Sequence, residues 1–192
     1  MNTSYLFLAE GFEEVEAIAP IDIMRRAGLK LNTVSISSNL DVTGAHGITI
    51  KADNLFNETN FADAEWLILP GGLPGANNLA EFKPLNDLLV SHHSHGGNIA
   101  AICASPAVVL APLGILDGRE ATCYPGFEET MKSAKKGYMP VCQDGNIITA
   151  NGPATATAFA LAIVAKAAGE ECAREVAEGM LLYNRKHQNF YF

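Results

Sequence analysis

Short apolar runs alternate with amphipathic segments along this chain. Runs that are typical of buried strands occupy 5–8, 66–69 and 98–102. Apolar residues recur at helical spacing across 13–27, and Gly28 follows as a residue that commonly ends a helix. Strands that alternate with helices indicate a mostly parallel sheet covered on both faces, so we expect an α/β fold.

The same pattern assigns most of the remaining chain. The expected elements are a strand at 31–37, a small hairpin at 41–50, a helix at 79–93 that Pro84 interrupts, a short helix at 127–134, a hairpin at 141–150, and helices at 154–168 and 171–182. No internal repeat or linker divides the sequence, and we expect one domain over 1–192. For the aromatic tail at 183–192, packing on the body, packing on a partner and disorder all stay open.

Composition narrows the class of protein. Of the 192 residues, 48% are hydrophobic and 18% charged, which is ordinary for a globular α/β protein. The net charge of −8 and the lack of a basic run argue against nucleic-acid binding. We expect no membrane span, because no apolar run approaches the roughly 20 residues that a span requires. We expect no signal peptide, because residues 1–4 lack a positive charge ahead of an apolar stretch. Four widely spaced cysteines without a CxxC pair favour free thiols in a reducing compartment, with the cytoplasm as the expected location.

Cys103 stands where the strand at 98–102 passes into a helix that has Pro106 in its first turn. Backbone N–H groups at such a junction favour negative charge, and the thiolate is the reactive form of cysteine. The alternative is a small buried hydrophobe, because free cysteines are among the most buried residues. The local sequence leaves both interpretations open.

Two other strands end in unusual residues, namely the acidic segment 9–16 and the Pro-Gly-Gly segment 70–75. Sites in open α/β sheets lie just beyond the carboxyl ends of the strands. If the three strands are neighbours, both segments meet Cys103 at one place.

Glu16 is the acidic residue with the strongest case for chemistry. Glu13 and Glu14 are explained more simply as first-turn residues that offset the helix dipole, whereas Glu16 leaves the helix in a different direction from Glu14. A carboxyl beside a thiolate tends to be protonated, so Glu16 could donate a hydrogen bond to sulfur and move a proton. The N–H groups of Gly72 and Ala104 could form an oxyanion hole, although the glycines could equally serve an ordinary loop.

An ordered set of motifs carries a family resemblance. The motifs are Glu13-Glu14-Val15-Glu16, Asp22–Gly28, Leu69–Gly72, Ala100–Ala104 and Asn151–Thr155. Together they resemble the ThiJ/PfpI superfamily, in the branch of the parkinsonism-associated protein deglycase. The resemblance implies a flavodoxin-like three-layer sandwich, a homodimer, no metal or other cofactor, and an easily oxidised nucleophile at Cys103. It also implies that Glu16 is the carboxyl partner and that Gly72 and Ala104 supply the oxyanion N–H groups.

Two departures from the family pattern concern supporting residues. Tyr124 stands where this branch often has a histidine, and tyrosine is a poor base near neutral pH. The protease branch has a histidine directly after the nucleophile, where this chain has Ala104, which argues against a Cys-His dyad. Of the basic pair that relatives carry near the site and the dimer contact, Arg26 matches one member and His46 replaces the other.

Other candidates have simpler explanations. His92 and His95 could bind a metal from one helical face, but histidines more often lie at a helix C-terminus, where cations are favourable. Cys123 could act as a resolving thiol for Cys103.

Three functions compete. The first is an enzyme that converts methylglyoxal, or its adducts on proteins, to lactate through a hemithioacetal on Cys103. The second is a redox sensor or stress chaperone in which Cys103 becomes a sulfinate without turnover. The third, a cysteine hydrolase, ranks last because no histidine is evident beside the nucleophile.

Overall fold

A computed structural model describes residues 2–182, and the aromatic tail expected at 183–192 lies outside the described residues. A seven-stranded sheet forms the centre of the fold, in the order β10-β11-β7-β6-β1-β2-β5. Its strands are β1 (Thr3–Leu8), β2 (Leu31–Ser35), β5 (Asn54–Leu55), β6 (Ala64–Leu69), β7 (Asn98–Ile102), β10 (Val141–Asp144) and β11 (Ile147–Ala150). Neighbouring strands pair in parallel except for the β10–β11 hairpin, so the expected mostly parallel sheet is confirmed.

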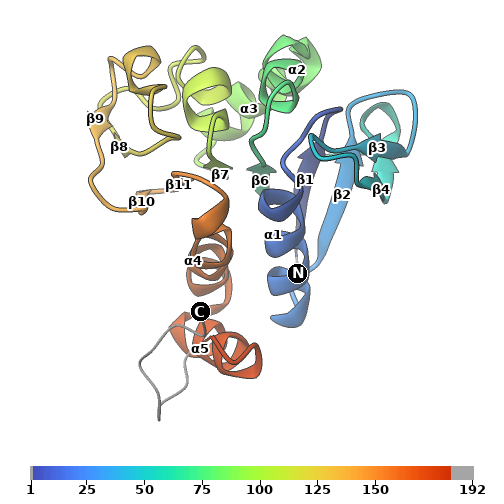
Figure 1. The fold of residues 1–192 in the computed structure, drawn as a ribbon, viewed down its shortest axis with the longest axis vertical. Helices are drawn as coiled ribbons and strands as arrows, with labels where there is room; N and C mark the ends of the chain where they lie inside the picture. Colours follow the sequence, from blue (N-terminus) through green and yellow to red (C-terminus); the bar gives the residue numbers. More distant parts are fainter. Residues whose placement is uncertain (1, 183–192) are drawn as a thin grey trace.

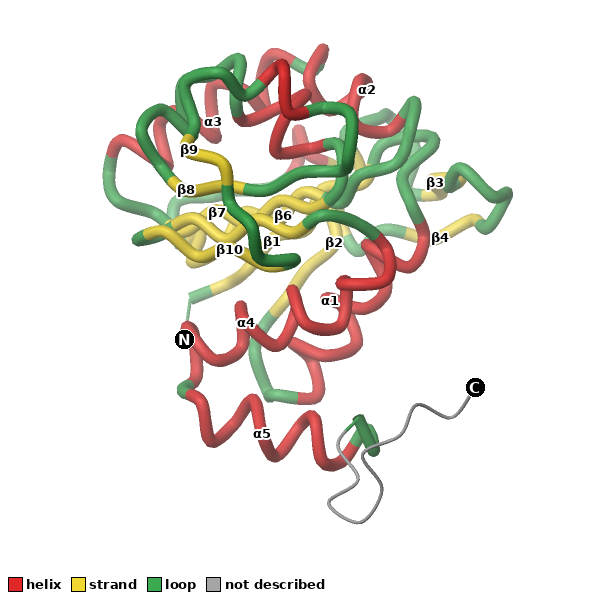
Figure 2. The backbone as a smooth tube through the Cα atoms, turned by 60° about the vertical axis from the view of Figure 1, so that its left-hand side comes forward, coloured by secondary structure: helices red, strands yellow, loops and turns green. Residues whose placement is uncertain are grey.

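Helices cover both faces of this sheet (Figures 1 and 2). One face carries α1 (Glu14–Arg26) and α4 (Ala156–Ala168), with α5 (Glu170–Gly179) packed against α4. The other carries α2 (Gly75–Glu81) and α3 (Lys83–Ser94). The arrangement is the flavodoxin-like three-layer sandwich that the family resemblance implies.

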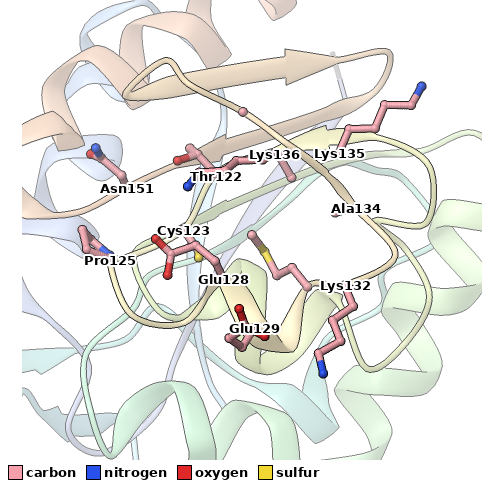
Figure 3. Close-up of a pocket in the computed structure, with 13 residues that line it drawn as sticks. Thr122, Cys123, Pro125, Glu128, Glu129, Lys132, Ala134, Lys135, Lys136 and Asn151 are labelled. Carbon is pink, nitrogen blue, oxygen red and sulfur yellow. The ribbon is translucent and has the colours of Figure 1, made fainter.

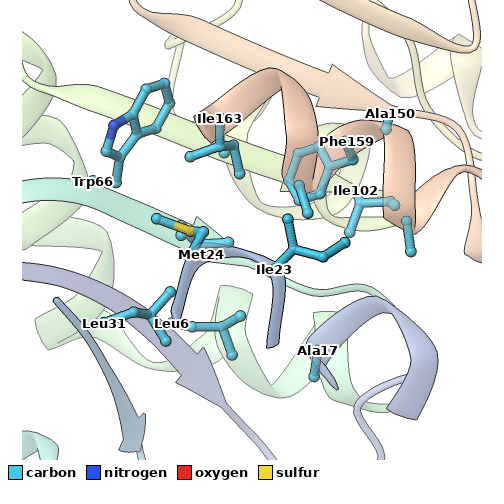
Figure 4. Packing of buried hydrophobic residues seen from close by; sticks show 14 of the residues in the cluster. Leu6, Ala17, Ile23, Met24, Leu31, Trp66, Ile102, Ala150, Phe159 and Ile163 are labelled. Carbon is cyan, nitrogen blue, oxygen red and sulfur yellow. The ribbon is translucent and has the colours of Figure 1, made fainter. Parts of the chain in front are cut away.

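Each face of the sheet has its own hydrophobic core because strand side chains alternate. In β1, Leu6 and Leu8 pack toward α1 and α4, whereas Tyr5 and Phe7 pack toward α2 and α3. Figure 4 shows the first core, where Met24 of α1 and Ile163 of α4 approach Trp66 of β6. These buried contacts fix α1 against the sheet, and α1 carries the acidic residues.

Several shorter elements lie outside the seven-stranded sheet. They are the hairpin β3 (Asp41–Thr43) and β4 (Thr49–Lys51), the parallel pair β8 (Glu120–Ala121) and β9 (Lys135–Lys136), the 3₁₀ turns η1 (Phe56–Glu58), η3 (Glu128–Thr130) and η4 (Pro153–Thr155), and the π-helical turn η2 (Pro106–Leu110). Within the described residues, no helix is both long and apolar enough to cross a membrane.

Two helix predictions need correction. The helix expected at 79–93 is two helices, because Phe82 ends α2 and Pro84 occupies the first turn of α3. The helix expected at 127–134 is only the turn η3, which buries none of its own side chains. Phe127, Met131 and Ala134 of this segment still pack against the core on the α2 and α3 face, but eight residues are too few to be stable as a helix on their own.

Candidate active site

Cys103 has a left-handed backbone at the point where β7 gives way to η2. Its φ is 65°, an uncommon value for a residue other than glycine. The Cys103 N–H donates to the Ala150 carbonyl at 2.8 Å, and the Tyr124 N–H donates to the Cys103 carbonyl at 2.7 Å. Strain of this kind persists only where the surroundings hold it, and these two hydrogen bonds do so.

Glu16 lies beneath the cysteine, on the inner side of α1. The helix begins with Glu13 as its N-cap, whose carboxylate accepts from the Glu16 N–H at 2.7 Å. The side chain of Glu16 is fully buried, and its Oε2 accepts from the Gly71 N–H at 2.9 Å. The carboxyl group also faces the Cys103 thiol closely enough for the two to affect each other's ionisation. The inward orientation that the sequence suggested for Glu16 is therefore present.

Glycine is required where the loop after β6 passes between these two side chains. A Cβ at Gly71 would lie 2.6 Å from the Cys103 Cβ and 2.7 Å from Glu16 Oε2. Gly72 has a φ of 87°, and its N–H and that of Ala104 act to lower the pKa of the Cys103 thiol. The three segments that end β1, β6 and β7 thus meet at one place because these strands are adjacent in the sheet.

Burial has the largest effect on the pKa values of Glu16 and Cys103. It raises the pKa of the Glu16 carboxyl to about 7, although hydrogen bonds with Cys103 and Gly71 act in the opposite direction. Burial and then the charge of Glu16 raise the pKa of the Cys103 thiol to about 12, against the opposing effect of the Gly72 and Ala104 N–H groups. The carboxyl and the thiol therefore titrate as a coupled pair, in which the charge on one group disfavours ionisation of the other.

The expectation of a resting thiolate beside a protonated acid stays a prediction. The N–H groups of Gly72 and Ala104 favour the thiolate, and desolvation of the sulfur opposes it. An ionised Glu16 beside a thiol is placed to take the thiol proton when a bond to sulfur forms.

Of the supporting residues, Tyr124 lies near Cys103 and Arg26 lies far from it. Tyr124 reaches Cys103 through its backbone, while its half-exposed ring packs edge-on against Phe127. Arg26 pairs with Asp22 at 2.7 Å, ten residues and so about 15 Å along α1 from Glu16. Within one chain the structure therefore brings Tyr124, but not Arg26, to the cysteine.

His46 belongs to the β3–β4 loop, and its Nδ1 lies 2.7 Å from Oε2 of Glu14. Glu14 is buried, and its Oε1 also accepts from the backbone N–H groups of His46 at 2.7 Å and Ile48 at 3.4 Å. Glu14 therefore does more than offset the helix dipole, because it anchors this loop to α1. Among residues 2–182, Cys103 has no imidazole partner.

Potential metal ligands are engaged in other contacts. Glu13, Glu14 and His46 have ligand atoms within 4.8 Å of one another, but Glu13 caps the helix and Glu14 binds the loop. His92 Nε2 lies 3.2 Å from the Asn98 carbonyl, and His95 Nδ1 lies 2.7 Å from the Ser91 carbonyl. These contacts agree with a role for both histidines at the end of α3.

A separate cavity of about 530 Å³ is lined by residues between 121 and 137 together with Asn151 (Figure 3). Cys123 lines it, and burial raises the pKa of this thiol to about 11. Cys123 packs in the core on the α2 and α3 face, whereas Cys103 packs in the other core. All four cysteines are free, and the two sulfurs belong to different packing environments.

Ser105 is the site residue that sequence reasoning missed. Its fully buried hydroxyl donates to the Pro70 carbonyl at 2.6 Å. A serine before a helical proline is typical of a cap, yet this side chain makes no capping hydrogen bond in η2. The only available signal was a polar residue two positions after the cysteine, in an otherwise apolar run.

Comparison with known proteins identifies relatives of this chain. The model of the DJ-1/PfpI family matches residues 3–166. Protein dj-1beta of Drosophila melanogaster is 38% identical over 187 residues, which cover 95% of this chain and 99% of that protein. The glutathione-independent glyoxalase DJR-1.2 of Caenorhabditis elegans is 36% identical, covering 84% of this chain and 86% of that protein.

Solved structures show the same fold. The oxidized DJ-1 of Toxoplasma gondii superposes with a TM-score of 0.91 at 34% identity, covering 94% of this chain and 98% of that one. Some relatives are longer, since this chain spans 49% and 40% of the DJ-1 homologs A and B of Arabidopsis thaliana. With its sheet order, its strained cysteine and a family match over most of its length, this chain belongs to the DJ-1/PfpI family.

Proposed function

We propose that this protein is a cysteine-dependent, glutathione-independent glyoxalase that converts methylglyoxal, or its adducts on proteins, to lactate. The observation that carries the proposal is the buried Glu16 carboxyl facing the Cys103 thiol, with the N–H groups of Gly72 and Ala104 on the same sulfur. The similarity to the glutathione-independent glyoxalase of C. elegans supports a glyoxalase-type reaction.

The reaction can be written with groups of this site alone. Cys103 adds to the aldehyde carbon as Glu16 accepts the thiol proton, and the carbonyl oxygen becomes the hydroxyl of a hemithioacetal. Glu16 then removes the proton from that carbon and returns it to the neighbouring ketone carbon. The hydroxyl proton of the hemithioacetal moves to the ketone oxygen, and the product is a lactoyl thioester. Water breaks the C–S bond and releases lactate and the thiol. Methylglyoxal and water together have the atoms of lactic acid, so no external oxidant or reductant is needed.

The N–H groups of Gly72 and Ala104 have a separate task. Oxygen develops negative charge as sulfur attacks the aldehyde and again as water attacks the thioester. Backbone donors fixed beside the sulfur stabilise that charge without having to reorganise. A resident cofactor has no part in this scheme.

Lactate production by purified protein tests the proposal. Removing the nucleophile in Cys103→Ser or the base in Glu16→Gln should lower the rate at least about 100-fold. Cys123→Ser is the matched control, because this cysteine is also buried but packs in the other core, and it should keep the wild-type rate. Equal lactate production by wild type and Cys103→Ser would remove the proposal.

A second candidate, a peroxide sensor, is favoured by the same N–H groups, which would hold a sulfinate on Cys103. Two molecules of hydrogen peroxide would convert the thiol to a sulfinic acid and release two of water. After mild peroxide treatment, peptide mass spectrometry should find Cys103 oxidised before Cys123 or Cys142. The opposite order would exclude this role.

The family resemblance also leads us to propose a homodimer in a reducing compartment such as the cytoplasm. The four free thiols are consistent with that compartment. A hydrolase of the Cys-His type gains no support, since the described residues offer Cys103 no imidazole.

A further inference from the structure

One peptide group is held from both sides beneath the cysteine. The carbonyl oxygen of Pro70 accepts the hydroxyl proton of Ser105 at 2.6 Å. The other end of the same peptide, the Gly71 N–H, donates to Glu16 Oε2 at 2.9 Å. Ser105, Pro70, Gly71 and Glu16 are all buried, so bulk water does not compete for these contacts.

The two hydrogen bonds are coupled through the peptide dipole. A donor on the carbonyl draws electron density toward oxygen and makes the N–H at the other end a stronger donor. The contact also fixes the plane of a peptide that is followed by two glycines, whose backbones have few restraints of their own. Ser105 therefore acts on Glu16 without touching it.

We propose that Ser105 is a positioning residue that aligns and polarises the Pro70–Gly71 peptide and thereby favours the ionised form of the Glu16 carboxyl. The inference deepens the proposed function, in which Glu16 accepts and returns protons, and it names the residue that tunes this base.

Other groups that face Glu16 must be considered with it. Glu13, from the start of the same helix, disfavours the ionised carboxyl by like charge. Cys103, from the end of β7, favours the ionised carboxyl through its thiol hydrogen bond. The Gly71 N–H acts in the same direction as that thiol, and Ser105 is the residue that strengthens it.

The test is a direct titration of Glu16 by carbon-13 NMR of glutamate side chains. The Glu16 signal is assigned as the one missing in Glu16→Gln. Ser105→Ala removes the hydroxyl and should raise the titration midpoint of Glu16 by about half a pH unit. Ser105→Gly also removes the hydroxyl and should raise it similarly, whereas Ser105→Thr keeps a hydroxyl and should stay near wild type.

Thr130→Ala is the matched control. The Thr130 hydroxyl also donates to backbone carbonyls, of Ala107 in η2 and of Phe127, but it does not contact the Pro70–Gly71 peptide. The Glu16 midpoint should therefore not move in this variant. An unchanged midpoint in the folded hydroxyl-deleting variants, or an equal shift in Thr130→Ala, would overturn the inference.

The readout does not depend on turnover. If the lactate experiment fails while the Glu16 midpoint moves as expected, the proposed reaction is wrong but the role of Ser105 stands. If lactate is produced and the Glu16 midpoint of Ser105→Ala matches wild type, the proposed reaction stands but the role of Ser105 is wrong.

Discussion

Glu16 is an ionisable group whose burial has a thermodynamic consequence that can be measured. Its pKa is about 7 in the folded protein, above the ordinary value of 4.5. The folded state therefore holds its proton over a pH interval in which the unfolded state has lost it. Because the free energy of unfolding rises with pH only where the unfolded state binds more protons, this group makes stability fall from about pH 4.5 to about pH 7.

We predict that Glu16→Gln abolishes this decrease of the free energy of unfolding with pH. Relative to wild type, the variant should gain about 3 kcal/mol in free energy of unfolding between pH 4.5 and pH 7, since each pKa unit corresponds to about 1.4 kcal/mol. Urea unfolding across that interval measures the difference. Glu81→Gln removes one charge from an exposed position and controls for net charge. A constant difference between wild type and Glu16→Gln at all pH values would contradict the prediction.

At the scale of elements, the first turn of α1 organises both the site and the β3–β4 hairpin. Glu14 faces the hairpin and Glu16 faces the cysteine, two residues apart on one helix. The hairpin is held further by the Ala45 N–H donating to the Phe12 carbonyl at 2.8 Å and by the Gly11 N–H donating to the Thr43 carbonyl at 2.8 Å. The Glu14 carboxylate adds the side-chain contacts between α1 and the loop of this hairpin.

We predict that Glu14→Ala frees the loop of the hairpin. Three donors, on His46 and Ile48, lose their carboxylate acceptor, and the expected cost is about 2 kcal/mol of unfolding free energy. Amide hydrogen exchange should speed up at His46 and Ile48 while β7 stays protected. Glu14→Gln keeps an acceptor oxygen and should lie between wild type and alanine. Unchanged exchange at these amides would show that backbone contacts alone hold the hairpin.

Sequence patterns predicted the large elements because burial determines them. Strands β1, β6 and β7 and helices α1 and α4 each have a long apolar run or face, and all were expected. The two-residue strand β5 lacks such a pattern, and the apolar spacing at 127–134 yields only the turn η3, so both depend on tertiary contacts. In the same way, Cys103 and Glu16 could be placed from the ends of strands, but the protonation of the pair depends on burial that no local pattern encodes.

For the whole molecule, the proposed homodimer has a candidate surface on the outer side of α1. Val15 and Ile18 are 53% and 44% exposed and lie three residues apart on one helix face. Ile48 of the adjoining hairpin loop is 53% exposed. Exposed aliphatic side chains that gather on neighbouring elements are typical of protein contacts.

We predict that wild type has the mass of a dimer in light scattering and that Ile18→Lys shifts it to the monomer, because an ammonium group in an apolar contact must be desolvated without a partner. Val90→Lys is the matched control, since Val90 is 45% exposed on α3, on the opposite face of the sheet, and should leave the mass unchanged. A monomeric wild type would exclude the dimer, and a dimeric Ile18→Lys would place its interface elsewhere. Because α1 also carries Glu16, a dimer contact on the outer side of this helix would restrict the position of the base of the proposed reaction, in addition to the packing of α1 on the sheet.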